Sequence, residues 1–145
     1  MEDRNTAIPR TVRLLGYAGL IPFVALAALF FLADPEWRYS VLSALCAYAA
    51  VIVSFLGAIH WGLAMRAESS SHWPYIWGVT PCLLAWACLL PPPAVGLCLL
   101  AAVLWACLLV DRNAYPGFGV AHWLRMRLIL TTVASICCGL AGVLA

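Results

Sequence analysis

The sequence has very little charge for its length. Charged residues make up 10% of its 145 residues, against about 25% in soluble domains, and it has no lysine. Hydrophobic residues make up 66%. A soluble fold this short cannot bury so much apolar surface, because small domains keep a large ratio of surface to volume. The composition therefore excludes a soluble domain. It predicts one transmembrane domain over residues 1–145, in contact with the lipid bilayer and not with nucleic acid.

The sequence also lacks C-x-x-C pairs, which are typical of zinc and thiol redox sites. An odd number of cysteines inside apolar runs argues against a disulfide framework as well. We therefore interpret the cysteines as small apolar residues. They are Cys46, Cys82, Cys88, Cys98, Cys107, Cys137 and Cys138.

Five apolar runs are separated by polar or proline-containing stretches. A spanning helix needs ~20 apolar residues, and lipid cannot satisfy an open backbone, which leaves helices as the economical choice. The sequence thus predicts an all-α integral membrane bundle of five transmembrane helices. The expected spans are about 14–33, 39–65, 75–90, 94–110 and 123–145.

Prolines and small residues predict further features of these spans. Pro22 and Pro81 fall inside spans, where each frees a carbonyl one turn earlier. Pro91 to Pro93 is expected to close a tight hairpin, because prolines cannot continue a helix. Small residues spaced three or four apart give the second span one close-packing face, which favours a central position. They are Ser43, Ala47, Ala50, Ser54 and Gly57.

The arginines predict the orientation. With the N-terminus inside, three arginines fall in the N-terminal tail, one in the 66–74 loop and three in 111–127, whereas the outer segments hold only Arg38. This asymmetry follows the positive-inside rule. It predicts a cytoplasmic N-terminus and an outside C-terminus. The first apolar run exceeds a signal-peptide core of about 7–15 residues, and no A-x-A site follows it, so we expect it to remain as a span.

No acidic or basic residue lies deep in any predicted span, and His60 is the one ionisable side chain expected there. Ion pumps and secondary transporters keep such groups in the bilayer to bind the coupling ion, so the pattern disfavours both classes. The spacings of a nucleophile and its base are also missing. We therefore expect a protein that is not an enzyme.

Each of the three histidines precedes a tryptophan. One interpretation is an aromatic belt at the headgroup level. Another is a pocket for an organic ligand, and a third is a haem or metal site, since neutral imidazole binds both. No metal-binding spacing occurs, so no cofactor is predicted and haem or a metal ion ranks last. The pairs are His60-Trp61, His72-Trp73 and His122-Trp123.

Two sets of candidate site residues follow from these patterns. The candidate ligand-binding set is His60, Trp61, Gly57, Pro81 and Trp123. The candidate set for an anion or lipid headgroup is Arg112, Arg125, Arg127 and Asp111. Alternatively, these arginines only enforce topology. No catalytic residue and no metal ligand is predicted.

Three segments carry a family resemblance: residues 17–23 (YAGLIPF), residues 54–62 (SFLGAIHWG) and residues 123–128 (WLRMRL) with Thr131. They resemble an uncharacterised bacterial membrane family, a domain of unknown function shared with the mitochondrial transmembrane protein 69 of animals. The resemblance implies a multi-pass protein of the bacterial inner membrane with five spans, and it brings no activity. The positions it marks for testing first are Gly57, His60, Trp61, Asp111, Arg125 and Arg127.

Three functions remain open. The first is a non-enzymatic scaffold or assembly partner of other membrane proteins, or a homo-oligomer, because catalytic groups are missing and small-residue faces are abundant. The alternative is a binding protein for an apolar or aromatic ligand, such as a porphyrin, quinone or lipid, near His60 and Trp61. The third is a haem or metal protein.

Overall fold

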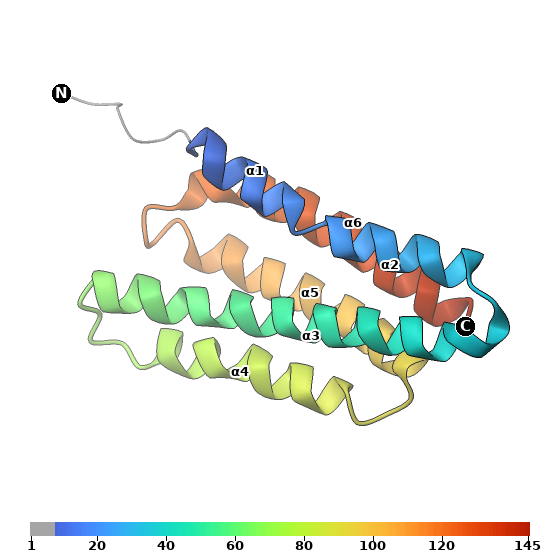
Figure 1. Ribbon diagram of the computed structural model, residues 1–145. Coiled ribbons are helices and arrows are strands. Elements are labelled where there is room, and N and C mark those ends of the chain that lie inside the picture. Colours follow the sequence, from blue (N-terminus) through green and yellow to red (C-terminus); the bar gives the residue numbers. More distant parts are fainter. Residues whose placement is uncertain (1–7) are drawn as a thin grey trace.

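The computed structural model describes residues 8–145. This part of the chain contains six α-helices, one 3-10 turn and no strand (Figure 1), which confirms the all-α prediction. Arg4, one of the three N-terminal arginines, lies outside the described residues. The elements are α1 (Arg10–Ala18), α2 (Ile21–Leu32), α3 (Pro35–Arg66), α4 (Trp73–Cys88), α5 (Pro93–Ala114), η1 (Ala121–Trp123) and α6 (Leu124–Val143).

The first predicted span consists of two helices. α1 ends at Ala18 and α2 begins at Ile21, so the continuous helix expected over 14–33 is interrupted just before Pro22. Pro22 has no N–H to bond the carbonyl of Ala18, and its ring crowds that carbonyl. At the interruption the Tyr48 hydroxyl of α3 donates a hydrogen bond to the Gly19 carbonyl over 2.8 Å. A neighbouring helix thus satisfies part of the broken backbone.

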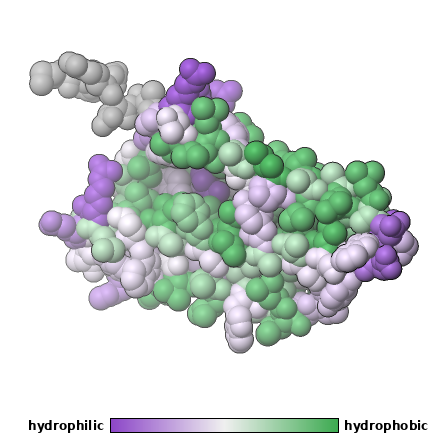
Figure 2. Space-filling view, in the orientation of Figure 1, coloured by the Kyte–Doolittle hydropathy of each residue, from purple (hydrophilic) through white to green (hydrophobic). Residues whose placement is uncertain are grey.

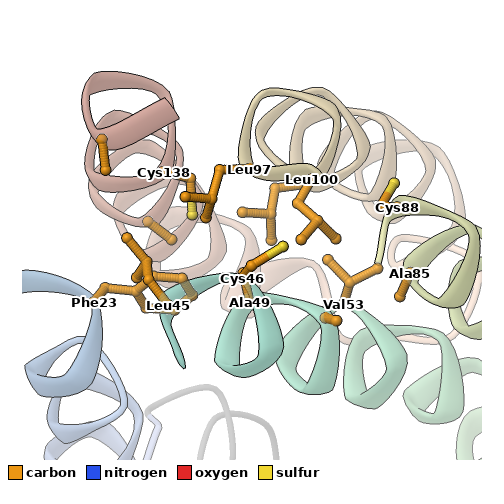
Figure 3. Packing of buried hydrophobic residues seen from close by; sticks show 14 of the residues in the cluster. Phe23, Leu45, Cys46, Ala49, Val53, Ala85, Cys88, Leu97, Leu100 and Cys138 are labelled. Carbon is orange, nitrogen blue, oxygen red and sulfur yellow. The ribbon is translucent and has the colours of Figure 1, made fainter. Parts of the chain in front are cut away.

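α3 occupies the centre of the bundle, as predicted. It has 32 residues, and it contacts α2, α4, α5 and α6. Its inner face contributes fully buried side chains, among them Leu45, Ala49 and Val53. Figure 3 shows these residues facing Leu97 and Leu100 of α5. The apolar core is therefore built around α3.

Glycines set the closest helix contacts. A Cβ built on Gly57 of α3 would lie 2.6 Å from the Gly78 carbonyl oxygen of α4, and one on Gly142 of α6 would lie 2.7 Å from the Ala94 carbonyl oxygen of α5. Of the predicted small-residue face, Gly57 and Ala50 are buried. The other three members are half-buried or exposed. The close-packing face is thus narrower than the spacing predicted.

α4 is shorter than the other long helices. Four helical segments within residues 8–145 are long and apolar enough to cross a membrane, and α4 is not among them. With 16 residues it is ~24 Å long, against ~30 Å of hydrocarbon. It nevertheless leads from the end of the bundle where α3 finishes to the opposite end, where α5 begins (Figure 1).

Six of the seven described arginines gather at one end of the bundle. The start of α1, the end of α3, the end of α5 and the start of α6 all lie at this end (Figure 1). Arg38, in the first turns of α3, lies toward the other end. The arginines of the first group are Arg10, Arg13, Arg66, Arg112, Arg125 and Arg127.

Candidate functional site

A charged cluster lies inside the arginine-rich end of the bundle. His60 of α3, Asp111 of α5 and Arg127 of α6 are 0%, 1% and 7% exposed. The Asp111 carboxylate accepts one hydrogen bond from His60 Nε2 over 2.9 Å and a second from Arg127 Nε over 2.8 Å. We call these three residues the buried triad. One carboxylate therefore links three helices.

The triad corrects the expectation that His60 is the one ionisable side chain inside the spans, because Asp111 and Arg127 are buried beside it. α5 continues to Ala114 instead of ending at about 110, so Asp111 lies within its last turn. Arg127 lies one turn into α6. The two charges compensate each other, and removing either partner would leave an uncompensated buried charge. Sequence hydropathy could not reveal this pairing, because it treats each residue separately.

Aromatic rings surround the histidine of the triad. The Tyr115 ring centroid lies 5.9 Å and the Trp73 centroid 6.1 Å from that of His60. Tyr115 follows the end of α5 and is 3% exposed. Burial, and secondly the Asp111 carboxylate, raise the pKa of Tyr115 to about 12, so its hydroxyl keeps its proton at neutral pH. Tyr115 belongs to no spacing motif, so it could not be singled out from the sequence.

Several buried polar atoms near the triad have no hydrogen-bond partner within residues 8–145. They are His60 Nδ1, Arg127 Nη2 and Thr131 Oγ1. The neighbouring Thr132 differs, because its hydroxyl donates to the Leu128 carbonyl over 2.8 Å. Buried polar groups are normally satisfied. A set of such atoms at one place is therefore a candidate binding feature.

An apolar groove reaches this polar cluster. It has a volume of about 680 Å³ and runs between α1, α2, α3 and α6. Figure 2 shows the surface hollowed below α1, with hydrophilic atoms visible inside the hollow. Arg66, Arg127, Thr131 and Tyr115 supply polar groups to its wall. Apolar residues that line it include Leu15, Phe23, Ile59, Met126 and Leu130.

The structure does not bring the candidate ligand-binding residues together around one cavity. Trp123 lines the groove, and His60 lies in the triad. Gly57 and Pro81 form the contact between α3 and α4, where a Cβ on Gly57 would lie 3.1 Å from the Pro81 ring. The Trp61 indole, on the exposed side of the same contact, donates to the Tyr75 carbonyl over 2.7 Å.

The candidate anion-binding residues also separate. Arg112 and Arg125 are exposed, whereas Arg127 is buried and bound to Asp111. The structure therefore assigns Asp111 and Arg127 to the triad, and the two exposed arginines to the surface.

The three histidine–tryptophan pairs have different surroundings. His60 is buried, His72 is exposed before α4, and His122 is half-buried in η1. Across residues 8–145, no three His, Cys, Asp or Glu side chains are grouped to hold a metal ion. Trp73 packs against His60 with ring centroids 6.1 Å apart, whereas Trp123 lines the groove, so the three pairs do not share one environment.

Comparisons with known proteins give a family and a partial relative. The family described as "Protein of unknown function (DUF3429)" matches residues 8–143. Transmembrane protein 69 of Xenopus tropicalis is 41% identical over 85 residues, which is 57% of this chain and 33% of that protein. The match thus spans about a third of the length of this curated relative. No solved structure matches the chain.

Proposed function

We propose, since the chain belongs to the DUF3429 family of membrane proteins, that it binds an apolar molecule taken from the bilayer in the groove below α1. The observation that carries this proposal is the groove itself, whose volume of about 680 Å³ falls within the roughly 300–1,000 Å³ typical of ligand sites. Apolar side chains with a few polar groups are also the usual lining of such sites.

The helix that covers the groove supports this function. α1 has no buried residue among the described positions, and it contacts mainly α6. It is separated from α2 by the interruption before Pro22. Elements with few buried contacts open at low free energy. α1 can therefore move without disrupting the core around α3, and an apolar molecule can enter beside it.

A groove-filling substitution tests the proposal. Leu130 lines the groove, so Leu130→Trp should occupy it, whereas Leu128 on the same helix is 49% exposed and provides the control Leu128→Trp. We expect mass spectrometry of protein extracted in mild detergent to detect a small apolar molecule near one-to-one stoichiometry. It should persist in Leu128→Trp and be lost in Leu130→Trp. Equal small-molecule content in all three proteins would contradict the proposal.

We further propose that the chain crosses the bacterial inner membrane five times, with its N-terminus in the cytoplasm. The grouping of six described arginines at one end supports this orientation through the positive-inside rule. The connection made by α4 between opposite ends of the bundle supports the fifth crossing. Its length can be matched by local thinning of the bilayer or by flanking residues at the interface.

An assembly role is the second candidate function, and the outer face of α4 favours it. Exposed apolar side chains three or four residues apart form a stripe on this helix. This stripe fits a partner membrane helix, including one from a second copy of the chain. Replacing Leu83 and Trp86 by alanine should release a copurifying protein or shift a dimer to a monomer. A monomer without any copurifying protein would contradict this role. The stripe is Trp73, Ile76, Val79, Leu83 and Trp86.

A further inference from the structure

We infer that the groove selects apolar molecules that carry a neutral oxygen acceptor, such as a ketone or quinone carbonyl, and that Arg127 and Thr131 bind this oxygen. The inference rests on the proposed ligand-binding function and specifies the chemistry of the ligand. It follows from the unpaired hydrogen-bond donors in the polar part of the groove wall, and from the charges of Asp111 and Arg127, which already compensate each other there.

Two donors of the groove wall have no acceptor among residues 8–145. Arg127 Nη2 and Thr131 Oγ1 are both buried, and both side chains line the groove. They lie one helical turn apart on α6, on the same face. A buried donor without an acceptor destabilises the protein, because it has lost its hydrogen bond to water without replacing it. An oxygen that accepts from both would remove this cost.

The paired charges favour a neutral acceptor. Arg127 is already compensated by Asp111 over 2.8 Å, and Asp111 also accepts from His60. A carboxylate bound at the same place would add a second buried negative charge, which is costly without its own partner. A carbonyl oxygen accepts hydrogen bonds without adding charge. Arg66, the other arginine that lines the groove, is exposed and therefore lies outside this buried polar cluster.

Access to the donors requires a small rearrangement of the groove wall. Nη2 and Oγ1 are buried, so a ligand oxygen must displace the side chains over them. Met126 lines the groove beside Arg127 and packs against Gly16 of α1. Methionine is unbranched and adapts its shape readily. It can therefore make way for a ligand without movement of the helix backbone.

A matched set of radiolabelled probes tests the inference. The probes are 2-nonadecanone, nonadecane and nonadecanoate, which share a chain length and differ in the head group. Binding is measured to the full-length protein in nanodiscs, with nanodiscs containing Leu130→Trp as the blank for partition into lipid. We expect 2-nonadecanone to bind about 10-fold more tightly than nonadecane, which corresponds to the contribution of one or two hydrogen bonds.

Two neighbouring threonines supply the variant and its control. Thr131→Val should weaken binding of the ketone by roughly 3- to 10-fold and leave nonadecane unchanged. Thr132→Val should change the binding of neither the ketone nor nonadecane, because the Thr132 hydroxyl is already bonded to the Leu128 carbonyl. Thermal unfolding of both variants checks that they are folded.

The possible outcomes separate the inference from the proposed function. Equal binding of nonadecane and 2-nonadecanone would overturn the neutral-acceptor inference and leave the groove as a purely apolar site. Tighter binding of nonadecanoate that depends on Arg66 would overturn it as well. If no probe binds wild type above the Leu130→Trp blank, the proposed function fails too.

Discussion

The charges of the buried triad lie at unfavourable helix positions. Asp111 lies in the last turn of α5 and Arg127 near the start of α6. A carboxylate near a C-terminus and a cation near an N-terminus both oppose the helix macrodipole. Neither charge therefore stabilises its own helix, and each depends on the other.

Removing the charge of Asp111 should destabilise the protein strongly. Asp111→Asn leaves Arg127 without its counter-charge, so the free energy of unfolding should fall by about 3–5 kcal/mol. Titration with a denaturing detergent measures it. The control is Asp34→Asn at an exposed residue before α3, where the change should stay within about 0.5 kcal/mol.

The double variant Asp111→Leu with Arg127→Met separates the effect of an unpaired charge on stability from the effect of side-chain packing. Replacing both charges by apolar groups of similar volume should recover much of the lost stability, because the cost comes from the unpaired charge. A double variant as unstable as the sum of two single losses would contradict this account.

At the scale of helices, the sequence predicted where each helix lies along the chain better than the residues at which it begins and ends. A helical segment lies near each of the five expected ranges, because long apolar runs dominate the energetics of a chain in lipid. Pro22 itself accounts for the interruption before it and is visible in the sequence. The groups that bond the Gly19 carbonyl and the Asp111 carboxylate, namely the Tyr48 hydroxyl and the Arg127 guanidinium, are tertiary partners. Composition does not show such partners. The close helix contacts at glycines were predicted only in part for the same reason. The spacing of small residues does not show which of them faces the backbone of a neighbouring helix.

Two glycines of α3 should respond oppositely to alanine. Gly57→Ala places a Cβ 2.6 Å from the Gly78 carbonyl oxygen, so it should lower the free energy of unfolding by about 1–3 kcal/mol. In the described structure, a Cβ on Gly62 meets nothing within 4 Å. Gly62→Ala should raise the free energy of unfolding by up to about 1 kcal/mol, because alanine is the better helix former. Unfolding in denaturing detergent compares the two, and equal effects would show that α3 and α4 are not in close contact.

At the scale of the whole molecule, the sequence predicted several residues of the candidate site but not how they are grouped. His60, Asp111, Arg127 and Trp123 were all singled out from the sequence: the residue patterns divided them between two sets, and the family resemblance marked the first three together without predicting that they touch. The fold joins the first three, and places the fourth in the groove wall. Helices α3, α5 and α6 must pack before that grouping exists, so no local spacing encodes it.

Reporter fusions test the number of crossings. Fusions after Ser70 and Gly117 should report the cytoplasmic side, and fusions after Pro92 and Ala145 the outer side. The first two sites lie in the connections after α3 and after α5, at one end of the bundle, and the other two lie in the connection after α4 and at the C-terminus, at the opposite end (Figure 1). If Ser70 and Pro92 report the same side, α4 does not cross and the bundle has four spans.

The ion pair between Asp111 and Arg127 has a consequence for how the chain enters the membrane during synthesis. A lone Asp or Arg in an inserting helix costs about 2.5–3.5 kcal/mol at the helix centre, and less toward the helix ends, where Asp111 and Arg127 lie. Only the nine residues 115–123 separate α5 from α6, so the two opposite charges can meet while both helices are still beside the insertion machinery. We therefore expect α5 and α6 to leave it for lipid as one hairpin, with the charges of Asp111 and Arg127 neutralised by each other.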